Sequence, residues 1–518
     1  MLTTIYSAGL DGIDGYTVAI ETEVTPKAMP DFKVVGMTDV SIREAQNRVS
    51  VALHTLAIPM PRGEISVNLT PADLKKEGTS FDLGIFISIL RAGGMLNDAG
   101  SLERCCFIGE VSFTGRILPV NGVLNMCMAA REAGKNRVFV PAENAREASV
   151  VAGVHVYPVE HVTELLDYFS DAFQLNRTVF DYDEYEKKKN NYFFDYSDVR
   201  GQAFAKRAFE IAAAGGHSLL MVGPPGSGKT MLAKRLPTIL PPLTFEEALE
   251  STKMHSAAGI LDPETPLLSL RPFRAPHHTA SRIALIGGGR VPAPGEVSLA
   301  HNGVLFLDEL LEFDSKTLEA LRQPLEDRVV NVSRASGRAT FPSSFMLVAA
   351  ANPCKCGYFG SADRPCTCRE IDRRNYRAKL SGPLIDRIDI QIEVPSLGFG
   401  ELSRAPETAS SSEMRERVIR AREIAAARFA ASRTAKELHV YCNADIRGKE
   451  LQGLCEPGPE AIPFLQKIFS SMQLSARAYD HILRVARTIA DLAGSEKVKV
   501  EHVAEAVQFR VLDKKYFE

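Results

Sequence analysis

The sequence has no long hydrophobic run, no leader-like start and little net charge. No stretch of about 18 uncharged apolar residues occurs, so we expect no membrane-spanning helix. The first residues, MLTTIYSAGLDGIDGYTV, lack a basic segment followed by an apolar core, so we expect no secretory signal. A formal net charge of −3 gives no overall attraction for nucleic acid, and such a partner would have to bind local basic patches.

Cysteine is also scarce. The nine cysteines are an odd number spread over 518 residues, unlike the dense, paired framework of small secreted domains. We therefore expect reduced thiols and a cytoplasmic location, which leaves room for a metal site. The length exceeds that of one ordinary domain, and shares of 45% apolar and 24% charged residues are typical of soluble globular proteins. We expect about three or four domains.

The most specific motif is GPPGSGKT, at residues 223–230. It fits the phosphate-binding pattern G-x-x-x-x-G-K-[ST], with an apolar run before it and a helix-like segment after it. The glycines allow a tight turn that brings backbone N–H groups to phosphate oxygens, and the following helix directs its positive end there. We expect Lys229 to bind the outer phosphates and Thr230 to ligate Mg²⁺. The residues predicted to bind nucleotide are Gly223, Pro224, Pro225, Gly226, Ser227, Gly228, Lys229 and Thr230.

A second apolar run, residues 304–307, ends in Asp308 and Glu309, which is the form of a Walker B element. Parallel strands present polar groups at their carboxyl ends. We expect Asp308 to hold Mg²⁺, directly or through water, and Glu309 to act as general base for the attacking water. A third run, residues 345–351, ends in Asn352, whose amide would position that water, although Asn-Pro after a strand is by itself only a turn signal.

Two arginines further along the chain are candidates for stabilising charge at the γ-phosphate. Arg387 lies between a helix and a strand, and we expect it to serve as an arginine finger for a neighbouring subunit. Arg477, near the start of the longest C-terminal helix, resembles a sensor-2 arginine, acting either within its own subunit or across an interface. The alternative for Arg387 is a surface salt bridge with Asp386 or Asp389, and the alternative for Arg477 is an ordinary arginine on the surface of a helix.

The first 170 residues alternate short apolar runs with amphipathic helical segments, which indicates an α/β or α+β domain with its own core. Two segments, KEGTSFDL at 76–83 and GEVSFTGRILPVNG at 109–122, resemble the proteolytic domain of the Lon family. Ser80 matches that family's nucleophile, but Leu124 stands where its activating lysine belongs. We therefore expect a Lon-like fold without peptidase activity, with Ser80 capping the following helix.

The phosphate loop, the Asp-Glu strand end, Asn352 and the LIDRID segment are together similar to AAA+ ATPases of the magnesium-chelatase-like group. RPFRAPHHTAS at 271–281, GGGRVPAPGEVSLAHNGVLFLDE at 287–309, the cysteines of 354–368 and the Lon-like front domain narrow the resemblance to the YifB/ComM family, over almost the whole chain. The resemblance implies an α/β fold. An AAA+ parallel-sheet core with a C-terminal helical lid would follow an α+β Lon-protease-like domain.

The same resemblance implies a ring, usually a homo-hexamer, that hydrolyses ATP with Mg²⁺. The best-known members of the family are implicated in branch migration of DNA during natural transformation. We therefore expect a ring motor that acts on single-stranded or branched DNA. The alternative is a chaperone-like remodeller of a protein complex of the magnesium-chelatase type.

The long segment before the Walker B strand, residues 240–303, would place inserted loops in the pore of such a ring. Its arginines would contact DNA phosphates without reading bases, or else pack against a neighbouring subunit. These arginines are Arg271, Arg274, Arg282 and Arg290. We expect the adjacent His277 and His278 to be structural rather than metal ligands.

Four of the cysteines form the pattern CxC-x9-CxC. They are Cys354, Cys356, Cys366 and Cys368. Four thiolates in so short a loop would surround one tetrahedral Zn²⁺, and the alternative is four reduced thiols in a hairpin. The basic segment that follows would contact DNA or a neighbouring subunit, or form an ordinary solvated helix face. Its basic residues are Arg369, Arg373, Arg374, Arg377 and Lys379.

These features divide the chain into five parts: a Lon-like domain (1–170), a linker (171–194), the AAA+ core (195–396), a second linker (397–412) and the helical lid (413–518). The polar segment at 181–191 predicts an exposed linker, or alternatively the end of a solvated helix. Apolar periodicity in the lid predicts helices over 413–432, 461–472, 476–493 and 500–509.

Overall fold

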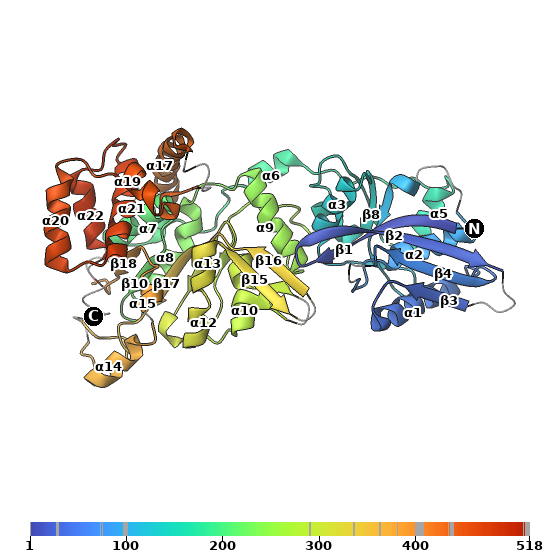
Figure 1. The fold of residues 1–518 in the computed structure, drawn as a ribbon, viewed down its shortest axis with the longest axis horizontal. Coiled ribbons are helices and arrows are strands. Elements are labelled where there is room, and N and C mark those ends of the chain that lie inside the picture. Colours follow the sequence, from blue (N-terminus) through green and yellow to red (C-terminus); the bar gives the residue numbers. More distant parts are fainter. Residues whose placement is uncertain are drawn as a thin grey trace.

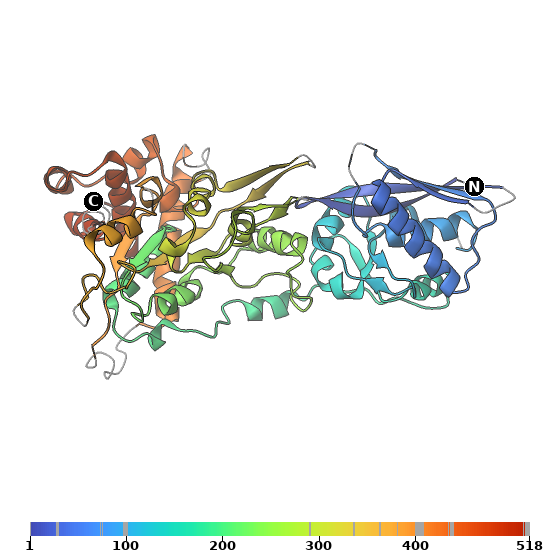
Figure 2. The same cartoon turned by 90° about the horizontal axis from the view of Figure 1, so that it is seen from below.

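The protein is elongated in the computed structural model, with the N-terminal domain at one end and the C-terminal helices at the other (Figures 1 and 2). The structure describes residues 2–26, 31–72, 74, 76–96, 102–289, 292–334, 337–361, 364–380, 382–398, 409–433, 435, 440–510 and 512. Arg290 and most of the predicted second linker, residues 399–408, lie outside these ranges.

The N-terminal domain contains a four-stranded sheet in the order β1-β2-β4-β3 and a three-stranded parallel sheet in the order β5-β8-β9. Its strands are β1 (Leu2–Asp11), β2 (Asp14–Thr25), β3 (Asp31–Val35), β4 (Glu64–Thr70), β5 (Cys105–Phe107), β6 (Glu110–Val111), β7 (Ile117–Leu118), β8 (Arg137–Pro141) and β9 (His155–Val159). Its helices are α1 (Asp39–Thr55), α2 (Asp82–Ala92), α3 (Val123–Glu132), α4 (Ala145–Ala148) and α5 (Val162–Phe169). Every residue of α2 except Arg91 is buried, because both of its faces are covered by apolar side chains.

The central domain is built on a five-stranded sheet in the order β11-β14-β17-β10-β18, with all neighbours parallel. These strands are β10 (Leu219–Val222), β11 (Phe273–Arg274), β14 (Val304–Leu307), β17 (Met346–Ala351) and β18 (Ile390–Glu393). Every residue of the three central strands is buried, as their continuous apolar runs require when helices cover both faces of a parallel sheet. The carboxyl ends of these strands therefore meet at one edge of the sheet.

The remaining helices and strands complete this part of the chain. They are α7 (Ala203–Gly215), α8 (Lys229–Arg235), α9 (Phe245–Ala257), α10 (Arg282–Ile286), β12 (Gly287–Gly288), β13 (Ala293–Pro294), α11 (Glu296–Leu299), α12 (Ser315–Glu319), α13 (Arg322–Asp327), β15 (Val329–Arg334), β16 (Gly337–Pro342), α14 (Glu370–Arg377) and α15 (Gly382–Ile385). β15 and β16 pair as an antiparallel hairpin beside the sheet.

The C-terminal part is helical, and all four predicted helices are confirmed with ends within two residues of those expected. Its helices are α17 (Ser411–Ala431), α19 (Lys449–Leu454), α20 (Ala461–Met472), α21 (Ala476–Leu492) and α22 (Val500–Gln508). Ser410 caps α17 in a reciprocal arrangement with Glu413. α21 packs against α7, α17 and α22, so the helical part shares one apolar core with the sheet of the central domain.

The segment predicted as an exposed linker instead forms a short helix, α6 (Tyr182–Lys188). The prediction is wrong for Tyr185, which is 3% exposed and packs into the core that the N-terminal domain shares with the central domain. One buried aromatic side chain in a highly charged stretch gives no visible periodicity, so the sequence pattern did not reveal it.

The N-terminal domain contacts the central domain through α3 and α9, which lie against each other. The backbone N–H of Gly122 donates to the carbonyl oxygen of Ser256 at 3.0 Å. The Ser256 hydroxyl donates in turn to the carboxylate of Glu147, which is buried at the contact. Burial raises the pKa of Glu147, while hydrogen bonds from Ser256 and Asn144 favour its ionised form. The contact is therefore specific and largely dehydrated.

Candidate functional site

The loop of residues 223–230 connects β10 to α8 at the carboxyl edge of the five-stranded sheet. A Cβ atom on Gly223 would lie 2.1 Å from the carbonyl oxygen of Val394, so only glycine fits there. Gly228 precedes α8 with φ of 90°, a left-handed conformation that disfavours side chains. The loop consequently wraps closely around the amino end of α8, where backbone N–H groups and the helix dipole favour an anion.

Lys229 lies over this loop. Its Nζ donates to the carbonyl oxygens of Gly223 and Pro224, both at 2.8 Å, and lies 3.3 Å from Oδ1 of Asn352. Burial lowers the pKa of Lys229 to about 8, although the nearby carboxylates of Asp308 and Glu309 oppose this. The predicted phosphate-binding lysine and the predicted water-positioning amide thus meet at the ends of neighbouring strands.

Thr230 and Asp308 are also brought together. The Thr230 hydroxyl donates to Oδ2 of Asp308 at 2.6 Å. Asp308 directly follows β14, which lies on the far side of β17 from β10, so the two residues approach across the carboxyl edge of the sheet. A hydroxyl and a carboxylate oxygen at this separation are hard ligands of the kind that Mg²⁺ prefers. The residues present therefore fit a magnesium ion.

Glu309 sits in a left-handed backbone conformation with φ of 51°, uncommon for a residue other than glycine. Its carboxylate is half exposed, and its Oε2 lies 3.2 Å from Nδ1 of His278. His278 belongs to the segment after β11 and stacks against His277, with ring centroids 4.1 Å apart. The sequence interpretation missed this contact, because nothing in the pattern at 277–278 relates it to the strand that ends at Leu307.

Arg387 and Arg477 lie at the other edge of the sheet. Arg387 precedes β18, whose first residue Ile390 pairs with Leu219, whereas the phosphate loop begins only after Val222. Three residue steps along the strands separate these levels by about 10 Å. Arg387 contacts the carboxylate of Glu326. In this subunit it therefore lies far from its own phosphate loop.

Arg477 shares that location. Its Nη1 donates to Oδ2 of Asp386 at 2.9 Å, and its side chain is 61% exposed. With Arg387 it lines a cavity of about 260 Å³ at the amino ends of the strands, which also contains Arg447 and Arg484. The two candidate arginines thus face one cavity together and point away from the phosphate loop of their own chain.

The four cysteines of the CxC-x9-CxC pattern converge, with their sulfur atoms all within 4.8 Å of one another. Sγ of Cys354 lies 3.4 Å from that of Cys356 and 3.6 Å from that of Cys366. Burial raises the pKa of Cys356, but backbone N–H groups and the neighbouring thiols outweigh this and lower it to about 5. The four sulfur atoms are therefore close enough to share one metal ion.

Comparison with known proteins shows which family the chain belongs to. Three family models match successive parts of it: Subunit ChlI of Mg-chelatase over residues 20–144, Magnesium chelatase, subunit ChlI over 195–402, and Magnesium chelatase, subunit ChlI C-terminal over 408–510. Competence protein ComM of Haemophilus influenzae is 40% identical over 519 residues, covering 99% of this chain and 98% of ComM. The chain belongs to the YifB/ComM family. Another member of this family, the Uncharacterized protein YifB of Escherichia coli, is 36% identical over 514 residues, which cover 99% of this chain and 98% of that protein.

The N-terminal part of this YifB/ComM chain also resembles Lon proteases. The mitochondrial Lon protease homolog of Bos taurus is 33% identical over 97 residues, 18% of this chain and 10% of that protein. Ser80 is buried, and its hydroxyl donates to the carbonyl oxygen of Ala8 at 3.1 Å, so the prediction that it caps α2 is wrong. Leu124 is fully buried in an apolar cluster.

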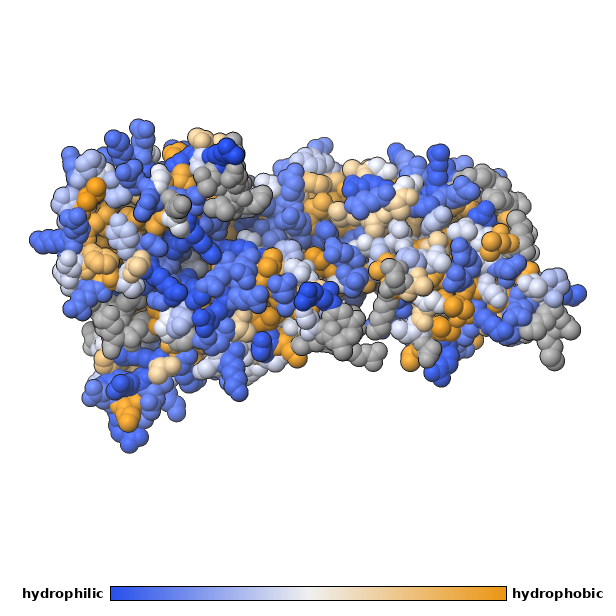
Figure 3. All heavy atoms as spheres, viewed as in Figure 1, coloured by the Kyte–Doolittle hydropathy of each residue, from blue (hydrophilic) through white to orange (hydrophobic). Residues whose placement is uncertain are grey.

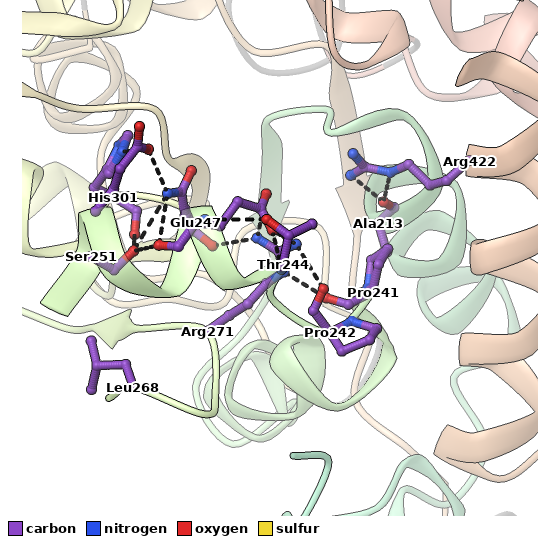
Figure 4. Close-up of polar contacts among 12 residues, drawn as sticks. Ala213, Pro241, Pro242, Thr244, Glu247, Ser251, Leu268, Arg271, His301 and Arg422 are labelled. Carbon is purple, nitrogen blue, oxygen red and sulfur yellow. Dashed lines mark hydrogen bonds and ion pairs between the residues drawn. The ribbon is translucent and has the colours of Figure 1, made fainter. Parts of the chain in front are cut away.

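Two arginines of the insert, Arg271 and Arg274, are held by contacts within their own chain. Arg271 donates to the carbonyl oxygens of Pro241 and Asn302 at 2.6 and 2.7 Å, and pairs with Glu247 at 2.9 Å (Figure 4). Arg274 pairs with Glu296 at 2.6 Å. Carboxylate partners within the insert hold both guanidinium groups, and contact of either arginine with DNA stays a prediction. Arg282, in contrast, is exposed on α10.

Among the helices of the described residues, none is both long and apolar enough to cross a membrane.

Proposed function

We propose that this protein is an ATP-hydrolysing ring motor that acts on DNA, in branch migration or helicase-type remodelling during recombination or natural transformation. One observation carries the ATPase part: Lys229, Thr230 and Asp308 meet at the carboxyl edge of the sheet, with Thr230 and Asp308 2.6 Å apart. ATP would bind on residues 223–230, with its phosphates against the amino end of α8.

Each side chain at this edge has a distinct role in the proposal. Thr230 and Asp308 would hold Mg²⁺, which when bound neutralises charge on the β- and γ-phosphates. Lys229 would exchange its hydrogen bonds to the loop carbonyl oxygens for hydrogen bonds to the outer phosphates, which are stronger because the acceptors are charged. Glu309 orients and deprotonates the attacking water, while Asn352 holds that water in line.

We further propose that Arg387 and Arg477 serve the nucleotide of a neighbouring subunit. Both face the cavity at the amino edge of the sheet, about 10 Å or more from their own phosphate loop. A ring contact is heterologous, so this edge of one subunit meets the carboxyl edge of the next. A homo-oligomeric ring, hexameric as in the AAA+ relatives that it resembles, would place both arginines at the neighbour's γ-phosphate.

The DNA part of the proposal is supported by the full-length similarity to a protein named for competence. Exposed Arg282 on α10 is a group of the insert that would meet DNA phosphates. A second candidate function, a chaperone-like remodeller of a protein complex, is favoured by the match to magnesium chelatase subunit models. The two are separated by whether DNA raises the ATPase rate.

The proposal includes three further expectations. Peptidase activity is absent, because Leu124 offers no base and the buried Ser80 hydroxyl is bound to Ala8. The cofactors are ATP and Mg²⁺, with Zn²⁺ as a structural metal in the four-cysteine cluster. The working location is the cytoplasm, where the cysteines stay reduced.

Glu309→Gln tests the ATPase assignment. The amide keeps the size of the side chain but cannot accept a proton, so the variant should bind a fluorescent ATP analogue like the native protein and lose turnover by about 100-fold or more. Glu416→Gln, at an exposed carboxylate on α17, is the matched control and should keep turnover. Undiminished hydrolysis by Glu309→Gln refutes the assignment.

A further inference from the structure

The four-cysteine cluster has the dimensions of a metal site. A tetrahedral zinc–thiolate centre with Zn–S bonds of about 2.3 Å places its sulfur atoms about 3.8 Å apart. Three of the Sγ–Sγ distances here are 3.4, 3.6 and 3.6 Å, and Cys368 joins through a 3.4 Å contact between its sulfur and the backbone N–H of Cys356. These separations are far longer than the 2.05 Å or so of a disulfide. Soft thiolates select zinc over magnesium.

The cluster organises a small lobe, the described residues of 353–379, which protrudes from the motor with α14 at its tip (Figures 1 and 3). The lobe has little apolar core of its own, since Tyr376 is the one residue of α14 that is buried. Two arginines of α14, Arg373 and Arg377, stack on the ring of Phe359 at 4.6 Å, which ties the helix to the loop. A segment with so few buried side chains needs another source of stability, which a bound metal supplies.

This lobe touches the phosphate loop and the sensor strand. Gly357 packs against Pro225 so closely that a Cβ atom would lie 2.5 Å from Cδ of that proline. Cys354 follows Asn352 by two residues and is fully buried. Nε of Arg377 donates to the carbonyl oxygen of Pro353 at 3.3 Å, which holds the intervening residue.

The lobe also touches the turn that follows the Walker B strand. Nζ of Lys379 donates to the carbonyl oxygen of Leu311 at 2.9 Å. Burial, together with the neighbouring Glu312 carboxylate, raises the pKa of Tyr376, so that phenol stays neutral against the turn. Leu311 lies two residues beyond Glu309. The lobe that holds the four cysteines therefore contacts three segments of the nucleotide site: the phosphate loop, the end of β17 and the turn after Glu309.

We propose that Cys354, Cys356, Cys366 and Cys368 hold one Zn²⁺, and that this metal keeps Asn352, Pro225 and the turn after Glu309 in the arrangement that hydrolysis needs. The inference rests on the proposed ATPase function for its second half. Zinc acts here as a positioning group away from the phosphates, so its loss reduces turnover more than nucleotide binding.

Metal content tests the first half directly. The native full-length protein should carry about one zinc per chain, and a variant with Cys366→Ser and Cys368→Ser should carry none. Thr367→Ala, an exposed change between those two cysteines, is the matched control and should keep its zinc. Replacing the native metal with Co²⁺ should give the intense visible bands of tetrahedral cobalt–thiolate. A native protein without zinc, or a cobalt spectrum typical of oxygen ligands, overturns the site.

Steady-state kinetics and nucleotide binding test the second half. The zinc-free variant should lose kcat on the order of 10- to 100-fold, as expected for reacting groups displaced by about 1 Å, while its Kd for a fluorescent ATP analogue changes little. Removing zinc from the native protein with a chelator should reproduce the loss, and Zn²⁺ but not added Mg²⁺ should restore it. Full kcat without zinc, or equal losses of kcat and nucleotide binding, overturns the positioning role.

Failure of the two proposals can be told apart. A native protein that carries zinc but never hydrolyses ATP removes the ATPase assignment and the positioning role while leaving the metal site. A native protein that hydrolyses ATP without zinc removes the metal site and leaves the ATPase assignment.

Discussion

Arg387→Ala is expected to abolish ATP hydrolysis in a uniform ring and to be rescued by a second inactive variant. The Arg387 guanidinium lies at the amino edge of the sheet beside Glu326, and the phosphate loop lies at the carboxyl edge. An arginine finger contributes about 10³-fold or more to kcat. The single variant should therefore bind ATP and hydrolyse it on the order of a thousandfold more slowly.

Mixing two inactive variants gives a quantitative test of this geometry. An Arg387→Ala subunit keeps an intact phosphate loop, and a Lys229→Ala subunit keeps an intact finger. In an equal mixture, a site has both an intact phosphate loop and an intact arginine finger when an Arg387→Ala subunit binds the nucleotide and its neighbour is a Lys229→Ala subunit. This arrangement occurs at about a quarter of the interfaces in a closed ring of heterologous contacts. Phosphate release by the mixture should recover to about a quarter of the native rate if the sites work independently.

The control is Arg420→Ala, an exposed arginine on α17, which should behave as the native protein in every mixture. Assembly of each variant is checked by size-exclusion chromatography. If Arg387 acted within its own chain, no mixed site would contain both parts. Rings that assemble normally but show no recovery on mixing would refute the assignment across subunits.

Three further outcomes are expected. Burial lowers the pKa of Lys229 to about 8. The affinity for a fluorescent ATP analogue should therefore be constant below about pH 8 and should fall as the pH rises above about 8, because the ammonium group loses its charge. An affinity that does not change over this pH range contradicts the prediction. His278→Ala should raise the DNA-independent ATPase rate about two- to fivefold, because a partly exposed contact worth about 0.5–1 kcal/mol no longer competes for the Glu309 carboxylate. The same change at the preceding histidine is the control, and a fall in rate contradicts the reasoning. Ser256→Ala should lower the free energy of unfolding by about 1–3 kcal/mol in urea titrations, because the buried Glu147 carboxylate loses a donor; a smaller effect means that the contact is hydrated.

The nucleotide site was predictable because its residues sit at fixed positions relative to local patterns. Apolar runs of four to six residues, followed by the phosphate loop, by Asp308 or by Asn352, specify buried parallel strands, and parallel strands end at one edge. The C-terminal helices were predictable for a similar reason, since apolar periodicity and the Ser410–Glu413 cap are read within one element.

What the sequence did not reveal depends on partners distant along the chain. Arg271 and Arg282 look alike in sequence, but Glu247 lies within reach of the first only after α9 has folded. The approach of His278 to Glu309 likewise requires β11 to lie beside β14. Side-chain pairing across elements decides which of these groups are structural, and no local pattern encodes it.

The effect of DNA on ATP hydrolysis tests the central claim most directly. The native protein is assayed without DNA and with single-stranded, duplex and branched DNA at two salt concentrations, beside Glu309→Gln. We predict that single-stranded or branched DNA raises the ATPase rate, that added salt weakens the effect as counterions compete for the phosphates, and that Glu309→Gln stays inactive throughout. An ATPase that no DNA stimulates at low salt would contradict a DNA motor and favour the remodelling of a protein complex.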